Sequence, residues 1–239
     1  MDAPTWVIEG DVFADGDEQL ITAARSAGGR VVRWDDEWLS AGLAATRVWE
    51  PGAFCATARF ECSAWWPTVA AHGDLLAPAF VLSTVEELTT LGPPEEFGDR
   101  IFVRPDSPLK PFSGRVLERG QISLRSLDHG FYYDDVTLPV MVTPIVDVGD
   151  EWRFVVVDGR VVAGSGYAAD GRTAGRPLGD DHPALEYAQS ILAYLAAPEA
   201  AFVLDVAEGP DGLRLLELNP FSGADLYACD RSAVVDAIH

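Results

Sequence analysis

The sequence predicts an α/β unit at the N-terminal end, followed by a larger α+β region with antiparallel sheets. In the first third of the chain, short β-branched runs flank an amphipathic segment with a helical period. In the second half, two Asp-Gly pairs, at 158–159 and 211–212, each separate two apolar runs, which is a strong hairpin signal. The length of 239 residues allows one large domain or two small ones that pack closely.

The N-terminal unit is expected to span residues 1–78. Its predicted elements are, in chain order, a strand at 6–8, a helix over 15–27, a strand at 31–34 and a helix near 61–71. Gly28 and Gly29 supply the end of the first helix.

The region from residue 79 onward is expected to be the α+β part. Its predicted elements are strands at 80–82, 101–103 and 115–117, an apolar strand region over 138–148, strands at 151–157 and 160–163, helices to Leu91 and over 182–196, and a last hairpin of 202–207 with 213–219. Ser83 and Glu86 fit a capping box at the start of the first helix, and Asp181 is a candidate cap for the second. Three prolines between Arg104 and Gly114 predict a loop.

The charge of the chain argues against two classes of partner. There are 38 acidic and 17 basic residues, a formal net charge of −21. Such a surface repels phosphate backbones and anionic lipid, so neither nucleic acid nor a membrane surface is expected as a partner. No basic, apolar export signal and no apolar run of about 18 residues is visible, and three cysteines without a paired motif suit a reducing compartment. A cytoplasmic location is expected.

The last hairpin carries the sharpest candidate site. Glu217 and Asn219 are two residues apart on one strand and therefore point to the same face. With a three-residue turn at 210–212, Asp205 lies directly opposite Glu217, where like charges repel unless they share a proton or a cation. Two carboxylates and an amide oxygen suit Mg²⁺ held together with phosphates. The alternative is an acidic pair that faces solvent, but the apolar strands around it favour the metal.

A basic segment over 100–126 is the second candidate. It contains six basic residues and two acidic ones, which gives a local charge of 6 − 2 = +4: Arg100, Arg104, Lys110, Arg115, Arg119 and Arg125 against Asp106 and Glu118. Such a segment next to a Mg²⁺ site could neutralise nucleotide phosphates, although a solvated basic face is the alternative. Lys110 is the single lysine of the chain. P-loop, zinc-hydrolase and serine-hydrolase motifs are absent from the sequence.

Three segments resemble the ATP-grasp superfamily, and more narrowly a clade of short ATP-grasp domain proteins. They are FVRPDSPLKPFSG (102–114), VMVTPIVDVGDEWRFVVVDGRVVAGSGY (140–167) and FVLDVAEGPDGLRLLELNPFSGADLY (202–227), and the resemblance covers about residues 79–239. It implies two lobes with antiparallel sheets that clasp the nucleotide, a small lobe at about 79–138 and a large lobe at about 139–239. ATP and Mg²⁺ are the implied cofactors.

The resemblance also implies roles for individual residues. Asp205, Glu217 and Asn219 would be the Mg²⁺ ligands, Arg104 and Lys110 would bind phosphates, Thr143, Pro144, Ile145 and Val146 would form the hinge that reads adenine, and Glu151 would bind the ribose. Arg153 lies on the same strand face as Glu151 and, with Arg172 and Arg176, is a candidate to act on the γ-phosphate or the substrate carboxylate. The acceptor is expected near residues 219–223.

The function implied is an ADP-forming ligase that joins a carboxylate to an amine through an acyl phosphate. The carboxylate would belong to a small molecule or a peptide, and a second copy of the chain is a candidate partner that completes the substrate site. Two alternatives stay open: a phosphotransferase with the same fold and site, and an ATP-binding module without catalytic activity.

Overall fold

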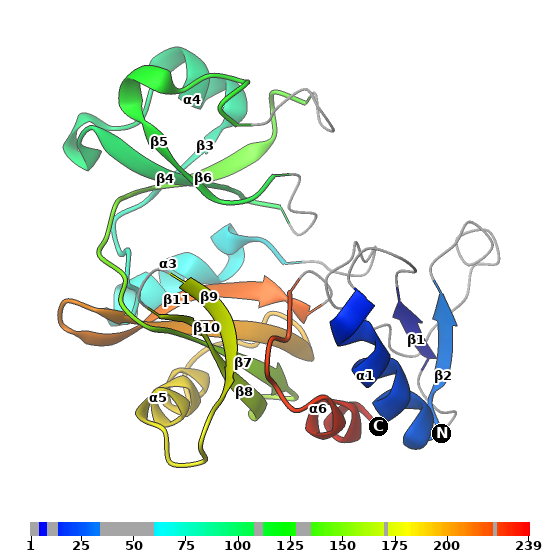
Figure 1. Ribbon diagram of the computed structural model, residues 1–239. Coiled ribbons are helices and arrows are strands. Elements are labelled where there is room, and N and C mark those ends of the chain that lie inside the picture. The colour runs from blue at the N-terminus through cyan, green and yellow to red at the C-terminus, as the bar shows by residue number, and fades with distance from the viewer. Residues whose placement is uncertain are drawn as a thin grey trace.

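The computed structural model describes residues 5–8, 14–33, 60–107, 112–127, 135–169, 172–221 and 224–239. These residues form a mixed α/β structure with two antiparallel sheets and a small parallel one, as the sequence predicts. Figure 1 shows the four-stranded sheet above the five-stranded sheet, and the N-terminal elements beside the lower one. None of the helices in these described ranges combines the length and the apolar character needed to span a membrane.

The N-terminal unit consists of β1 (Thr5–Ile8), α1 (Ala14–Ser26) and β2 (Arg30–Arg33). The two strands pair in parallel, with Trp6 opposite Val31. Trp6 is buried, and its indole N–H donates to His239 Nε2 at 3.2 Å. This contact and the packing of α1 on α6 (Arg231–Ile238) join the N-terminal unit to the other end of the chain (Figure 1).

The four-stranded sheet and its helix form the small lobe. Its elements are β3 (Val81–Thr84), α4 (Val85–Leu91), a short 3-10 turn (Glu95–Phe97), β4 (Arg100–Pro105), β5 (Arg115–Glu118), a second 3-10 turn (Arg119–Gln121) and β6 (Pro139–Pro144). The strand order is β3-β6-β4-β5. Because β6 pairs with β3 and β4, residues 139–144 belong to this sheet and not to the large lobe, where the sequence resemblance places them.

The five-stranded sheet forms the core of the large lobe. Its elements are β7 (Glu151–Val157), β8 (Arg160–Ala169), β9 (Arg172–Pro177), α5 (Pro183–Leu192), β10 (Ala201–Gly209) and β11 (Gly212–Pro220), in the sheet order β11-β10-β7-β8-β9. The Asp158-Gly159 hairpin is confirmed, because Val157 pairs with Arg160 across a two-residue turn in which both turn residues have positive φ.

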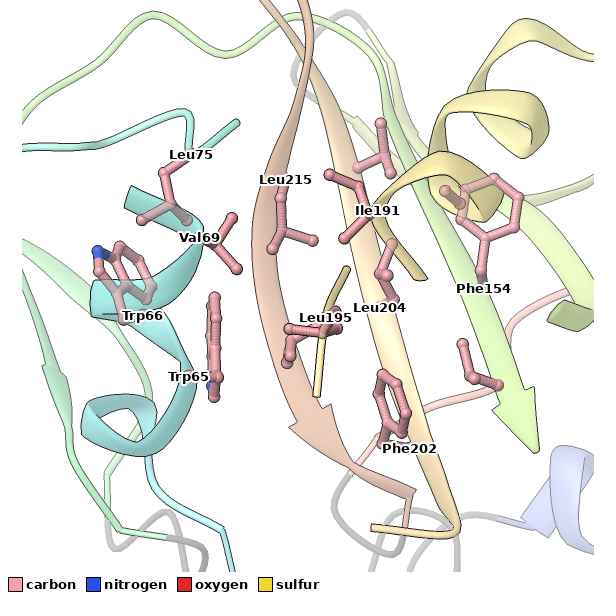
Figure 2. Close-up of a cluster of buried hydrophobic side chains, with 14 of the residues drawn as sticks. Trp65, Trp66, Val69, Leu75, Phe154, Ile191, Leu195, Phe202, Leu204 and Leu215 are labelled. Atoms are coloured by element: carbon pink, nitrogen blue, oxygen red, sulfur yellow. The ribbon is translucent and has the colours of Figure 1, made fainter. Parts of the chain in front are cut away.

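Alternation along the strands divides the large sheet into two faces. Phe202, Leu204 and Val206 of β10 belong to one apolar cluster, together with Phe154 of β7. Helix α5 and helix α3 (Cys62–His72) complete this cluster, and Figure 2 shows their side chains packed around β10 and β11. The opposite face is covered at one end by α1 and α6, through Val155, Val157 and Val203 among others. The other end of that face carries the polar residues of the candidate site.

Three local predictions differ from the structure at the ends of elements. The capping box uses Thr84 and Glu87 instead of Ser83 and Glu86, because Ser83 is still paired with Val140 in β3. Helix α5 is capped by His182, whose Nδ1 accepts from the Ala184 amide at 3.2 Å, and not by Asp181. It also ends at Leu192, earlier than predicted.

Candidate functional site

A row of polar side chains crosses four neighbouring strands of the large sheet. Direct pairing places Ser165 of β8 opposite Arg153 of β7, Arg153 opposite Asp205 of β10, and Asp205 opposite Glu217 of β11. Directly paired residues point to the same face of a sheet, so all four project together. The predicted pairing of Asp205 with Glu217 is thereby confirmed.

The route to that pairing differs from the prediction. The β10–β11 turn contains two residues, since Gly209 pairs with Gly212. A bulge between Asp205 and Val206 then shifts the register by one, because Val206 pairs with Leu215 whereas Asp205 pairs with Glu217. The extra residue, Leu216, lies between these pairs. The bulge thus brings the two carboxylates together where a regular ladder would not.

Arg153 and Asp205 form a two-pronged ion pair in the interior. Arg153 Nε donates to Asp205 Oδ1 at 2.8 Å, and Nη2 donates to Oδ2 at 2.7 Å. Asp205 has no exposed surface and Arg153 is 7% exposed. Burial raises the pKa of Asp205 to about 6, against the lowering effect of Arg153. Burial alone would lower the pKa of Arg153, but the Asp205 carboxylate outweighs it and the net shift is upward.

Arg104 reaches the same group from the small lobe. Its Nη1 donates to Glu217 Oε2 at 2.5 Å, and its Nη2 lies 3.4 Å from Asn219 Oδ1. Asn219 in turn donates through Nδ2 to Glu217 Oε1 at 2.6 Å. We call Arg104, Arg153, Asp205, Glu217 and Asn219 the ion-pair cluster. It joins the two lobes, because β4 belongs to one sheet and β11 to the other.

Glu151 lies beside the ion-pair cluster at the start of β7. The Tyr167 hydroxyl of β8 donates to Glu151 Oε2. Burial raises the pKa of Glu151, while this hydrogen bond acts in the opposite direction. The Tyr167 ring stacks on Tyr227 with 5.0 Å between centroids, and Arg153 Cζ lies 5.1 Å from the centre of each ring.

A cavity of about 340 Å³ lies between the lobes, within the range of small-molecule sites. The small lobe and the connection to β7 line it with Phe102, Arg104, Val116, Thr143, Pro144, Ile145, Val146 and Val148, and the rest of the chain lines it with Trp66, Ala77, Glu151, Tyr167, Leu216 and Glu217. One end is therefore apolar and the other carries Arg104 and the two carboxylates Glu151 and Glu217. A second cavity of about 260 Å³ shares Phe102, Arg104 and Glu217 and extends to Ser113 and Gly114.

The cavities and the ion-pair cluster gather most of the candidate residues of the sequence analysis. Those found there are Arg104, Thr143, Pro144, Ile145, Val146, Glu151, Arg153, Asp205, Glu217 and Asn219. Arg176 instead lies at the exposed edge strand β9, where it contacts Asp150 at 3.6 Å and the Ala168 carbonyl at 3.3 Å. Lys110, the Arg172 side chain and residues 222–223 of the expected acceptor segment lie outside the described part of the chain.

Several lining residues were not predicted from the sequence. Leu216 enters the cavity through the bulge, which no sequence pattern announces. Trp66 comes from α3 and Phe102 from β4, both far from the last hairpin in sequence. Tyr167 had a usable signal, because the Asp158-Gly159 hairpin fixes the β7–β8 register and places Ser165 opposite Arg153, so that Tyr167 shares their face.

The two clasped sheets and the cavity between them are those of an ATP-grasp protein. Residues 78–237 match the model of an ATP-grasp domain family, the second family of its clade, and the chain belongs to this family. No match is found among curated proteins.

Solved structures share the fold at low sequence identity. A RimK domain ATP-grasp protein from Sphaerobacter thermophilus DSM 20745 is 14% identical with a TM-score of 0.63, over 98% of this chain and 100% of that one. D-alanine–D-alanine ligase from Bacillus anthracis is 10% identical with a TM-score of 0.57, over 99% and 92%. The ATP-grasp ligase PsnB, complexed with minimal precursor, Mg and ADP, is 15% identical with a TM-score of 0.51, over 100% and 97%.

The donor chemistry of the ion-pair cluster fits the Mg²⁺ that the ATP-grasp fold implies. Asp205, Glu217 and Asn219 offer carboxylate and amide oxygens, and the Asn219 Nδ2 atom lies 2.6 Å from Glu217 Oε1 and 3.4 Å from Asp205 Oδ2. Within the described ranges, no group of three His, Cys, Asp or Glu residues could hold a metal. A cation here would depend on Asn219 and on bound phosphates, which is how Mg²⁺ is usually held beside nucleotides.

Proposed function

We propose that this chain is an ADP-forming ligase that uses ATP and Mg²⁺ to join a carboxylate to an amine. The observation that supports it most is the meeting of Arg104 from the small lobe with Glu217 and Asn219 from the large lobe at the polar end of the cavity. A basic group next to an oxygen donor set is what a Mg²⁺–triphosphate requires. Membership of the ATP-grasp family supports the same assignment.

The apolar end of the cavity would take the adenine. Ile145, Val146 and Leu216 line it there. Pro144 has no N–H, and its carbonyl already accepts from the Thr143 hydroxyl at 3.1 Å. A carbonyl oxygen has a second lone pair, so Pro144 can still accept from the adenine amino group. Glu151 would accept from the ribose hydroxyls, with Tyr167 already bonded to its Oε2 atom.

The polar end would take the phosphates. Arg104 would exchange Glu217 for phosphate oxygens, and Lys110 would reach them from the loop after β4. Asp205, Glu217 and Asn219 would hold Mg²⁺, which spreads the charge of the transferring phosphoryl group when it is bound. Arg153 would act through Asp205, since its guanidinium holds both oxygens of that carboxylate. Arg176 would approach the γ-phosphate or the substrate from β9.

The reaction proposed has two steps. A carboxylate oxygen of the substrate attacks the γ-phosphorus, the bond to ADP breaks, and an acyl phosphate forms. The amine nitrogen then attacks the acyl carbon, phosphate leaves, and the nitrogen loses a proton to give an amide. The chain contributes by positioning the reactants and by neutralising charge, because phosphoryl transfer needs little covalent help from the protein.

The substrates proposed are a small-molecule or peptide carboxylate and an amine. Support comes from the titles of two structures of the same fold, which name a D-alanine–D-alanine ligase and a ligase with a minimal precursor. The amine would bind near residues 219–223, and a second copy of the chain is a proposed partner that completes the site. The net charge of −21 supports a cytoplasmic protein that avoids nucleic acid and anionic membranes.

A screen of carboxylate and amine pairs for ADP release tests this proposal. Release that requires both substrates, with an amide identified by mass spectrometry, is the expected result. A stable phosphorylated product without an amide would favour the phosphotransferase instead. Tight ATP binding without ADP release for any pair would favour the binding module.

A further inference from the structure

Tyr227 has a backbone conformation that a residue with a side chain rarely adopts. Its φ is +46°, in the left-handed region. Among the non-glycine residues described, Asp158 shares this property, but it lies in a hairpin turn where Asp is well tolerated. Tyr227 lies in the segment between β11 and α6, next to the ion-pair cluster. Strain of this kind persists only where the surroundings enforce it, and it is common at functional sites.

Hydrogen bonds from three other residues enforce the Tyr227 turn. Arg231 Nη1 donates to the carbonyls of Tyr227 and Cys229, the latter at 2.6 Å. The Ala228 amide donates to Ser165 Oγ at 3.1 Å. Arg153 Nη1 donates to the Asp225 carbonyl at 2.9 Å. The turn is therefore fixed both by α6 and by the polar row of the large sheet.

The turn presents the Tyr227 ring to Tyr167. The two rings are 9° from parallel with centroids 5.0 Å apart. No hydrogen bond of the Tyr227 hydroxyl is found in the described part of the chain, so the ring rather than the hydroxyl makes the contact. The Tyr167 hydroxyl, in contrast, donates to Glu151 at the cavity wall.

We propose that Tyr227 is a positioning residue of the nucleotide site, which acts through Tyr167 to hold the Glu151 carboxylate toward the ribose. The inference rests on the proposed function, in which Glu151 accepts from the ribose hydroxyls. Tyr167 occupies Oε2 of Glu151 and so leaves Oε1 for the ribose. Without the stacked ring, Tyr167 gains other rotamers and Glu151 loses the donor that orients it.

Discrimination between ATP and 2′-deoxyATP measures this effect directly. The Kd of each nucleotide in the presence of Mg²⁺ is determined by calorimetry. A hydrogen bond to a charged group predicts that wild type prefers ATP by about ten-fold or more. Tyr227→Gly removes the ring and accommodates the positive φ without strain, so the protein stays folded. We expect its preference for ATP to fall below about three-fold, because most of that hydrogen-bond contribution is lost.

Two further variants separate positioning from general damage. Tyr227→Phe keeps the ring and is expected to restore the wild-type preference. Tyr194→Leu removes a different aromatic ring of the large lobe, whose hydroxyl donates to Asp74 at 2.6 Å. This variant lowers stability through that lost contact but should keep the preference for ATP. Wild-type preference in Tyr227→Gly would overturn the inference.

Failure of the proposed function gives a different result. If wild type does not prefer ATP over 2′-deoxyATP, the ribose role of Glu151 is wrong. The crystal structure of Tyr227→Gly without nucleotide then decides the inference. A Tyr167 ring turned away from Glu151 supports the positioning contact, and an unchanged Tyr167–Glu151 hydrogen bond overturns it.

Discussion

Asp205 has no exposed surface, and a second carboxylate, Glu217, lies directly opposite it. Two buried like charges would repel strongly, and each loses several kcal/mol of hydration. Arg153 and Arg104 each bind one of the two carboxylates, at 2.7 and 2.5 Å respectively. The repulsion visible in the sequence is thus compensated before any cation binds.

Glu217→Gln is expected to abolish ADP formation and to lower stability. The amide keeps the shape of the side chain but removes the negative charge that Arg104 and Mg²⁺ both require. Glu217 is 24% exposed at its side chain, so we expect a loss of about 1–2 kcal/mol, less than for a fully buried pair. The measurements are ADP release and thermal unfolding without ligand.

Glu118→Gln is the matched control. Glu118 pairs with Arg100 at 3.3 Å, and both side chains are more than half exposed. This variant should be close to wild type in both measurements, because exposed pairs contribute little. Full activity in Glu217→Gln would contradict the role of the ion-pair cluster.

Lys110→Arg is expected to reduce ADP release strongly without changing the melting temperature of the free protein. Lysine is a compact charge and arginine a broad planar one, so the exchange should displace the phosphates in a proline-bounded loop. A misplacement of about 1 Å can cost on the order of 100-fold in rate. Steady-state ADP release and thermal unfolding check both parts.

Arg100→Lys is the control for this exchange, because Arg100 is exposed and lies on the strand before the loop. Arg119 would be unsuitable, since its guanidinium donates to the carbonyls of Pro93, Pro94 and Gly98 at 2.6–3.0 Å. If Lys110→Arg and Arg100→Lys are equally silent, Lys110 has no phosphate role and Arg104 alone remains.

The types of residue at the site could be predicted from the sequence, but their partners could not. The spacing of Glu217 and Asn219 and the hairpin around them are local properties of the chain. Arg104, in contrast, is separated from Glu217 by 113 positions, and its ion pair depends on how the two lobes meet. Single-residue patterns carry no information on such a contact.

At the scale of elements, the last hairpin shows two deviations that cancel. A two-residue turn replaces the predicted three-residue turn, and the bulge at Asp205 restores the predicted pairing. The bulge also gives Leu216 access to the cavity. Turn residues indicate where a hairpin bends, whereas a bulge in the strand follows from side-chain packing on both faces.

Thr84→Ala tests which residue begins α4. The Thr84 hydroxyl accepts from the Glu87 amide at 3.1 Å, and Glu87 accepts from the Thr84 amide at 3.2 Å. Loss of this cap should cost about 1 kcal/mol in urea unfolding. Ser83→Ala, one residue earlier, should cost less than about 0.5 kcal/mol. A larger effect at Ser83 than at Thr84 would restore the helix start that the sequence predicts.

Two elements of the structure have no clear sequence signal. Strand β9 reads Arg-Thr-Ala-Gly-Arg-Pro and lacks a β-branched run, and it forms because β8 offers it an unpaired edge. Helix α6 is short, with eight residues, and packs on α1 and the large sheet. Both depend on tertiary contacts, which override weak local propensity.

At the scale of the whole molecule, α3 lies at the junction of the two lobes. Its Trp65 and Val69 belong to the large-lobe cluster, which also includes Met141 of β6. The Ser63 amide near the start of α3 donates to Asp106 Oδ1, just after β4, at 3.0 Å. The division of the chain after residue 78 remains a prediction, since α3 precedes it and yet packs on elements that follow it. The cavity thus has a wall that both halves of the sequence supply.

The central claim is that the cavity between the lobes binds Mg²⁺–ATP through the ion-pair cluster. Calorimetric titration of ATP with and without Mg²⁺, into wild type and Glu217→Gln, tests it most directly. Wild type should bind ATP more tightly with Mg²⁺ than without it, by about ten-fold or more, and the variant should lose this difference. An equal Mg²⁺ effect in both proteins, or no ATP binding by wild type, would contradict the account.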